Sequence, residues 1–252
     1  MTDELVITSS FHSPDAGELA LGGDAGEPRQ VAAELVGRDP GTDLALWRVP
    51  GGGLTPARLR DLDDARVGQL AIAVGRPGRS VRASLRAIGV LAADVRTPWG
   101  GRLERYLETD RALPRGFAGG PLVDVDGAVY GMSTRTLVRG ADLAVPAVTI
   151  RRVVDELLAH GGVRRGYLGV GAVPVELDGE VGALVARVDD GSPAAAAGVR
   201  IGDVILRLGG APTRGPDGLR AALWERPGAE VELALSRAGA AVTVMVTLGS
   251  RT

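Results

Sequence analysis

Apolar and polar residues alternate along many short segments of this chain. Val31, Ala33 and Leu35 alternate in one such segment, and residues 231–235 and 242–246 repeat the pattern. A period of two puts alternate side chains on one face of a strand, so these segments predict half-buried β-strands. With short apolar runs bounded by turn residues, the same reasoning predicts strands at 5–9, 18–38 (two strands with a turn at 22–26), 67–75, 81–92, 103–108, 122–125, 128–132 and 142–146.

A different period appears between residues 150 and 158. Its apolar positions are spaced i, i+3, i+4, i+7 and i+8, which predicts a helix with one apolar face: Ile150, Val153, Val154, Leu157 and Leu158. Gly161-Gly162 would end this helix and begin a linker. The chain is therefore predicted to hold two domains, residues 1–160 and 161–252. Shorter helices are predicted after the Ser192-Pro193 cap and at 216–226.

Composition narrows the class of fold and of ligand. A chain of 252 residues can bury two cores, and its 38 glycines and 15 prolines suit short strands joined by tight turns. The net charge is −2 with no long run of one sign, so neither nucleic acid nor an anionic membrane surface is an expected partner. Cysteine is absent, and the two histidines, His12 and His160, lie far apart in sequence. This is a poor set of ligands, so no metal and no cofactor are predicted.

The compartment follows from the apolar runs and the first residues. No stretch approaches the roughly 20 apolar residues that cross a bilayer, so no membrane insertion is predicted. Residues 1–4 are acidic where a signal peptide would be basic. As written, the sequence predicts a cytoplasmic protein.

One glycine-rich loop organises the interpretation of the first domain. It runs Gly116-Phe117-Ala118-Gly119-Gly120-Pro121-Leu122, with Thr109-Asp110 just upstream. Glycines allow a sharp turn in which the N–H groups of Gly116 and Ala118 converge on an oxyanion. The loop resembles the nucleophile loop of the HtrA (Do/Deg) branch of trypsin-like serine proteases, where the pattern is Gly-Asn-Ser-Gly-Gly-Pro-Leu. Ala118 stands at the serine position, and a methyl group cannot attack a carbonyl.

The resemblance continues at the other two triad positions. Residues 8–12, Thr-Ser-Ser-Phe-His, resemble the family's Thr-Xaa-Xaa-His-Val strand, which puts Phe11 at the base position and His12 one residue late. A slip of one residue turns a side chain to the opposite face of a strand, although a local bulge would bring His12 back as a shifted base. Asp43 matches the position of the triad acid. Only four residues precede the first strand, where the family has two more strands, so a double β-barrel with a truncated N-terminal barrel is expected.

The second domain resembles the PDZ domains attached to HtrA proteases. The segment Gly166-Tyr167-Leu168-Gly169-Val170 looks like the carboxylate-binding loop, and its last three N–H groups would form an anion nest for a peptide C-terminus. The helix at 216–226 would flank the groove with Leu219 and Leu223. Arg164 and Arg165 add charge near a bound carboxylate, or are solvated linker residues.

Two functions of different class follow from these resemblances. In the first, the chain is a pseudoprotease that binds polypeptide C-termini or unfolded segments, as an adaptor or regulator of active protease relatives. In the second, it is a serine endopeptidase of protein quality control with a non-standard triad that includes His12. The family usually works in the cell envelope, so a start upstream of Met1 would move the expected location there.

Overall fold

The computed structural model describes residues 2–14, 17–22, 28–78, 80–138, 140–177 and 179–252. It divides into two compact units, Met1–Val163 and Arg164–Thr252. Most of the predicted turn at 22–26 lies outside the described residues.

The first half of unit 1 is a four-stranded antiparallel sheet in the order β1-β4-β3-β2. Both β1 and β2 are edge strands of this sheet within the described residues. The strands are β1 (Leu5–Ser9), β2 (Gly17–Gly22), β3 (Pro28–Asp39) and β4 (Leu44–Arg48).

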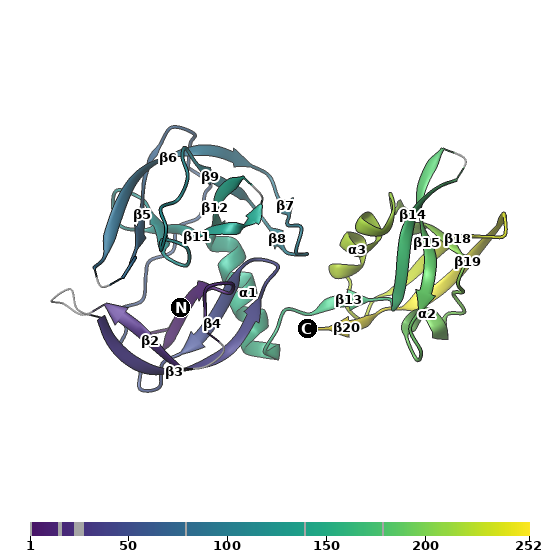
Figure 1. The fold of residues 1–252 in the computed structure, drawn as a ribbon, viewed down its shortest axis with the longest axis horizontal. Helices are drawn as coiled ribbons and strands as arrows, with labels where there is room; N and C mark the ends of the chain where they lie inside the picture. The colour runs from purple at the N-terminus through teal and green to yellow at the C-terminus, as the bar shows by residue number, and fades with distance from the viewer. Residues whose placement is uncertain (1, 15–16, 23–27, 79, 139, 178) are drawn as a thin grey trace. The chain divides into compact units, whose positions relative to one another are not determined.

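The second half of unit 1 is a closed barrel in the order β10-β11-β12-β9-β6-β5 (Figure 1). The two predicted strands around Asp126-Gly127 form β10 and β11, which pair as an antiparallel hairpin. The strands of the barrel are β5 (Leu70–Gly75), β6 (Arg82–Ala92), β9 (Tyr106–Thr109), β10 (Pro121–Val123), β11 (Val129–Val138) and β12 (Ala141–Pro146). Two short strands, β7 (Val95–Arg96) and β8 (Arg102–Leu103), pair with each other in a separate sheet.

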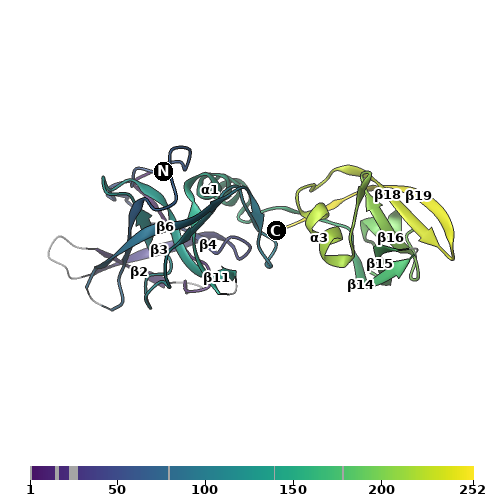
Figure 2. The same ribbon diagram turned by 90° about the horizontal axis from the view of Figure 1, so that it is seen from above.

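Helix α1 (Ala147–His160) packs against strands of both halves of unit 1, among them β3, β4, β11 and β12 (Figure 2). Four of the five apolar residues that predicted this helix pack inward, and Leu158 is 44% exposed. Gly161 ends the helix in the left-handed conformation with φ of 70°, and its N–H donates to the Leu157 carbonyl. The predicted helix end at Gly161 is therefore correct.

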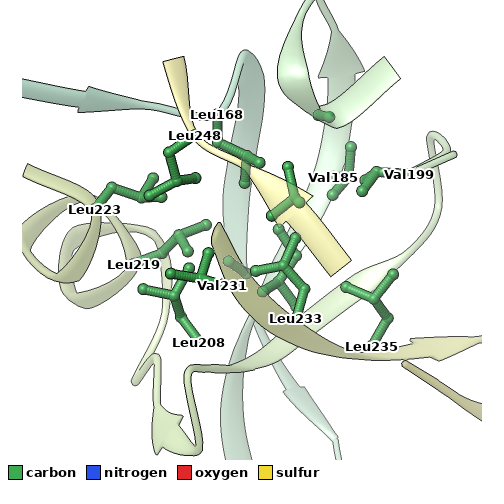
Figure 3. Packing of buried hydrophobic residues seen from close by; sticks show 14 residues of the cluster. Leu168, Val185, Val199, Leu208, Leu219, Leu223, Val231, Leu233, Leu235 and Leu248 are labelled. Carbon is green, nitrogen blue, oxygen red and sulfur yellow. The ribbon is translucent and has the colours of Figure 1, made fainter. Parts of the chain in front are cut away.

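Unit 2 is built on a sheet in the order β14-β15-β16-β18-β19, with β14 at one edge. Figure 3 shows its core, where Leu219 and Leu223 point from α3 toward leucines and valines of the sheet. The predicted helix at 216–226 ends at Trp224, because a residue before proline disfavours the helical conformation and Arg226 precedes Pro227. The elements are β13 (Arg165–Tyr167), β14 (Val170–Leu177), β15 (Glu180–Val188), α2 (Pro193–Ala196), β16 (Val204–Leu208), β17 (Ala211–Pro212), α3 (Pro216–Trp224), β18 (Glu230–Arg237), β19 (Ala240–Thr247) and β20 (Gly249–Arg251).

Candidate functional site

A fully buried carboxylate, Asp43, joins the two halves of unit 1. Its Oδ1 accepts hydrogen bonds from the Ser9 hydroxyl at 2.7 Å and from the Phe11 N–H at 3.0 Å. Its Oδ2 accepts from the Thr134 hydroxyl at 2.6 Å and the Thr136 hydroxyl at 3.1 Å. Four donors from β1, its exit and β11 therefore surround the predicted acid. A carboxylate can be buried at low cost only when it is paired in this way.

The base position beside this carboxylate holds a phenyl ring. Phe11 is 43% exposed and packs against Trp99, with ring centroids 5.6 Å apart and ring planes at 56°. His12, one residue later, places Nδ1 3.0 Å from the Ser9 hydroxyl oxygen. In the hydrogen bonds of the described residues, His12 is thus linked to Asp43 only through Ser9. The structure brings the three sequence-predicted residues together, with Ser9 between imidazole and carboxylate.

The segment after β1 is held by two side chains from the neighbouring strands. The Arg38 guanidinium donates to the carbonyls of Ser10 at 2.8 Å and Ser13 at 3.1 Å, and also to that of Pro14. Indole Nε1 of Trp47 donates to the Ser13 hydroxyl at 2.8 Å. These contacts fix the path of residues 10–14, and hence the direction in which Phe11 and His12 project. Sequence reasoning did not find them.

The glycine-rich loop lies between β9 and β10. Gly116 has φ of 79°, a conformation that glycine adopts freely, and a Cβ there would lie 2.7 Å from Pro77 Cβ. The N–H of Gly119 donates to the Ser133 carbonyl at 2.8 Å and that of Gly120 to the Phe117 carbonyl at 3.0 Å. Among the described residues no acceptor takes the N–H of Gly116 or Ala118. These two donors are the ones that the sequence assigned to an oxyanion hole.

The loop lies against the end of β1. A Cβ built on Gly119 would lie 2.5 Å from the Thr8 hydroxyl oxygen and 2.9 Å from the Ser9 nitrogen. Ala118 directly precedes Gly119 in this loop. The nucleophile, base and acid positions of the sequence prediction thus occupy one region of unit 1.

Asp110 anchors the approach to this loop. Its N–H donates to the Ala87 carbonyl at 3.0 Å, and its carboxylate accepts from the Ala87 N–H at 3.1 Å. The hydrogen bond from the Ala87 N–H holds the pKa of the Asp110 carboxyl below its usual value. The two reciprocal bonds tie the loop entrance to β6, which stiffens the backbone on which Gly116 and Ala118 lie.

Unit 2 contains a second candidate site, a groove of about 300 Å³ between the β14 edge and α3. All seven residues that the sequence assigned to peptide binding line it. The lining consists of Gly166, Tyr167, Leu168, Gly169, Val170, Ala172, Pro216, Leu219, Arg220, Leu223 and Trp224. Such a groove beside an edge strand has the geometry in which an extended peptide adds to a sheet.

One end of this groove presents backbone N–H groups. The carbonyls of Leu168 and Gly169 point away into the fold, where they accept from Ala194 and Asp189 at 2.9 Å each. Their N–H groups meet no acceptor in the part of the chain that the structure describes. Gly169 has φ of 84°, and consecutive N–H groups around such a residue form a nest for an anion.

Tyr167 fixes this loop from the other side. Its hydroxyl donates to the Asp189 carboxylate at 2.5 Å, and this bond raises the pKa of the Tyr167 hydroxyl. The Arg251 guanidinium lies 3.3 Å above the Tyr167 ring centroid. The loop is therefore held in one conformation by contacts on its far side.

Over the described ranges, we find neither a cluster of three His, Cys, Asp or Glu side chains placed for a metal ion, nor a helix long and apolar enough to cross a membrane.

Comparisons with known proteins identify the families of both domains. Residues 2–132 match the trypsin-like peptidase domain family and residues 166–248 match the PDZ domain family. The periplasmic serine endoprotease DegP of Salmonella typhimurium is 33% identical over 87% of this chain and 49% of its own length. A probable periplasmic DegP-like endoprotease of Rhizobium meliloti is 36% identical over 88% of this chain and 46% of its own length. The chain thus spans about half the length of these curated relatives.

Solved structures give the same result. The HtrA-type protease AlgW, solved with a decapeptide, has a TM-score of 0.79 and 26% identity, covering 100% of this chain and 81% of the AlgW chain. A serine endoprotease from Yersinia pestis has a TM-score of 0.75 and 26% identity, covering 100% of this chain and 87% of its own. The chain therefore belongs to the trypsin-like peptidase family, as an HtrA-like member that combines the trypsin fold with a PDZ domain.

Proposed function

We propose that this chain is an HtrA-like pseudoprotease. It binds polypeptides without cleaving them, recognises peptide C-termini through its PDZ domain, and acts as an adaptor or regulator of active protease relatives. One observation carries the proposal: the side chain in the loop with two free N–H groups is the methyl of Ala118. Acyl transfer by this fold requires a hydroxyl there and an imidazole to take its proton.

The surroundings of Asp43 support the proposal. Phe11 offers no proton acceptor at the base position. The Nδ1 of His12 lies 3.0 Å from Ser9 Oγ, so its hydrogen-bond partner is that hydroxyl and not the Asp43 carboxylate. A general base must be oriented by its acid while it faces the nucleophile. The neutral methyl group and the phenyl ring remove both proton-transfer partners together, and triad members act as a unit.

The alternative is an active serine endopeptidase of protein quality control with Ser9, His12 and Asp43 as its triad. Ser9 Oγ lies within hydrogen-bond distance of both partners, at 3.0 Å and 2.7 Å, which is the observation in its favour. Yet Ser9 is 0% exposed and donates its proton to the carboxylate. A nucleophile has to meet the substrate carbonyl, and this hydroxyl is enclosed. We therefore rank this function second.

Peptide binding and location rest on the relatives. AlgW was solved with a decapeptide, which supports polypeptide as the ligand class here. The curated relatives are named as periplasmic endoproteases, which favours the cell envelope over the cytoplasmic location expected from the sequence. A contact through one extended peptide buries little area, so the dissociation constant should be on the order of micromolar.

The test compares the wild type with designed revertants of the full chain. Cleavage of unfolded casein and labelling by a fluorophosphonate probe would be measured for wild type, Ala118→Ser, and Phe11→His combined with Ala118→Ser. The Ser9 hydroxyl donates to Asp43 Oδ1 and would compete with an imidazole at position 11 for this oxygen. A further variant therefore adds Ser9→Ala to the double change, so that the imidazole can donate its hydrogen bond to Asp43. Binding of unfolded casein serves as the control for folding.

The proposal expects casein binding by wild type with neither labelling nor turnover. Ala118→Ser alone should stay below about 10³–10⁴-fold over water, the level left when only the oxyanion hole and binding act. Activity should return when base and nucleophile are restored together. Turnover by wild type would overturn the pseudoprotease proposal, and its loss in a Ser9→Ala single variant, measured alongside, would identify Ser9 as the nucleophile of the alternative triad.

A further inference from the structure

The lining of the PDZ groove contains one charged side chain. Of the described residues that line it, ten are glycine, proline, aliphatic or aromatic, and only Arg220 carries a charge. The Arg220 side chain is 55% exposed, so its guanidinium is reachable from solvent. A single cation on an otherwise apolar groove is a means of selecting a ligand as well as holding it.

Stacking on an aromatic ring holds Arg220 at the groove rim. Its guanidinium carbon lies 5.4 Å from the centroid of the Trp224 ring, and that of Arg165 lies 5.7 Å from the same centroid. Arg220 also pairs with Asp217 at 2.8 Å, but the Asp217 side chain is 90% exposed. Such exposed ion pairs are weak and exchange readily. The ring of Trp224 thus favours a position of the guanidinium at the groove rim, where a ligand carboxylate can replace the exposed Asp217 as its partner.

The position of Arg220 along the groove identifies the ligand residue that it meets. The end of α3 lies against β13, the strand that leads into the nest: a Cβ on Gly166, two residues before Leu168, would lie 2.1 Å from the Leu223 carbonyl oxygen. Leu223 and Leu168 also line the same groove. Arg220 comes three residues before Leu223, about 5 Å along the helix axis. A strand rises about 3.3 Å per residue, so this distance corresponds to about two ligand residues.

Strand periodicity gives the direction of the ligand side chains. In an extended peptide, side chains two residues apart point to the same side. If the last side chain enters the apolar pocket formed by Leu219 and Leu223, the third-from-last side chain also faces α3, near Arg220. Guanidinium groups bind carboxylates with charge-assisted hydrogen bonds.

We propose that the groove prefers peptide C-termini with an apolar last residue and an Asp or Glu two residues before it, and that Arg220 is the specificity-determining side chain. This inference rests on the proposed recognition of free C-termini, and it adds the class of ligand. Arg220 acts on the choice of peptide, whereas the N–H groups of Leu168 and Gly169 hold the terminal carboxylate that every ligand shares.

The experiment uses the full chain and decapeptides that end in valine, identical except for Glu, Gln or Lys at the third-from-last position. Each is titrated calorimetrically at low and high salt, and the Glu peptide is also made with an amidated C-terminus. Wild type is compared with Arg220→Gln and Arg220→Glu. Arg207→Gln is the matched control, because Arg207 is also an exposed ion-paired arginine of unit 2, outside the groove lining.

Wild type and Arg207→Gln should bind the Glu peptide about 3- to 10-fold more tightly than the Gln peptide, with Lys weakest and the preference reduced by salt. Arg220→Gln should equalise Glu and Gln, and Arg220→Glu should favour Lys. Equal binding of all three free-acid peptides by wild type, with amidation still weakening binding, would refute the acidic preference and leave C-terminal recognition intact. Loss of amidation sensitivity in Arg220→Gln would refute it as well, since Arg220 would then bind the terminal carboxylate. If amidation had no effect on wild type, the proposed C-terminal recognition itself would fail.

Discussion

Replacing Asp43 tests whether this buried carboxylate is retained for folding. The carboxylate is 0% exposed and accepts four hydrogen bonds, two of them from the fully buried hydroxyls of Ser9 and Thr134. Asp43→Ala removes this charged acceptor from both hydroxyls, whose other partners are His12 Nδ1 at 3.0 Å for Ser9 and the Thr136 hydroxyl at 3.3 Å for Thr134. We therefore expect a large loss of stability that owes nothing to catalysis.

The magnitude follows from the donors and from the backbone. A hydrogen bond to a charged group contributes about 1.5–3 kcal/mol, so losing the two from Ser9 and Thr134 costs about 3–6 kcal/mol. Asp43 also has φ of 57°, a left-handed conformation that Asn tolerates and alanine resists by about 1 kcal/mol. Asp43→Asn keeps an acceptor and this conformation, so it should cost only about 1–2 kcal/mol. The alanine change removes a large share of the 5–15 kcal/mol that stabilises a typical domain.

The assay is urea unfolding followed through tryptophan fluorescence, to which Trp47, fully buried in β4, contributes with the two other tryptophans of the chain. Asp61→Ala is the control, since the Asp61 side chain is 50% exposed and its pair with Arg151 is worth little. If Asp43→Ala lost less than 1 kcal/mol, or if Asn cost as much as Ala, the assigned structural role would be wrong.

Three further changes test the packing and the charges of the two units. Asp203→Asn removes a carboxylate whose pKa the bidentate Arg237 guanidinium holds below its usual range. The ion pair stabilises the fold fully above the pKa of Asp203 in the unfolded chain, about 3.9, and this stabilisation is lost as the pH falls through the lower pKa of the folded state. The variant should therefore lose about 2 kcal/mol of unfolding free energy at pH 7. Below pH 4 its unfolding free energy should fall less steeply than that of wild type. Gly120→Ala would put a Cβ 2.0 Å from the Val74 carbonyl oxygen, so thermal unfolding of unit 1 should shift down by several degrees, and an unchanged midpoint would contradict the packing. Leu219→Ala should cost about 2–5 kcal/mol in urea unfolding followed by Trp224 fluorescence, and a loss below 1 kcal/mol would place Leu219 outside the core.

Sequence periodicity predicted most of the fold because alternation and helical spacing are local signals. Its errors lie at boundaries. The strand predicted from residue 67 begins at Leu70, since Val67 and Gly68 form a turn in which Val67 is 62% exposed. The strand predicted at 103–108 is divided between β8, which ends at Leu103, and β9, which begins at Tyr106. The short strand β7 was not predicted, because two residues carry no period.

The sequence also located the candidate site but not its hydrogen bonds. Motif spacing placed Asp43 and Phe11 in one region, as the structure does. The hydroxyls of Thr134 and Thr136 lie more than 90 residues from Asp43 along the chain, and only the pairing of β11 within the barrel brings them to it. The sequence signal that could have indicated these bonds is the pair of hydroxyl residues two positions apart, Thr134 and Thr136, in the mostly buried strand β11.

The site positions that match the family pattern stabilise the fold, whereas the positions that depart from it contribute little to packing. Asp43 accepts hydrogen bonds from four donors in β1, the segment after it and β11, so we expect it to stabilise the fold whether or not a reaction occurs. The loop N–H groups belong to the backbone and persist with any side chain at residue 118. By contrast, the nucleophile and base positions contribute reactivity with little packing: Phe11 is 43% exposed, and Ala118 is only partly buried. Under the proposed function, changes at these two positions remove proton transfer and nucleophilic attack at little cost in packing. An acid position that matches the family is therefore no argument for catalysis here, and this division is the one that a polypeptide-binding pseudoprotease would retain.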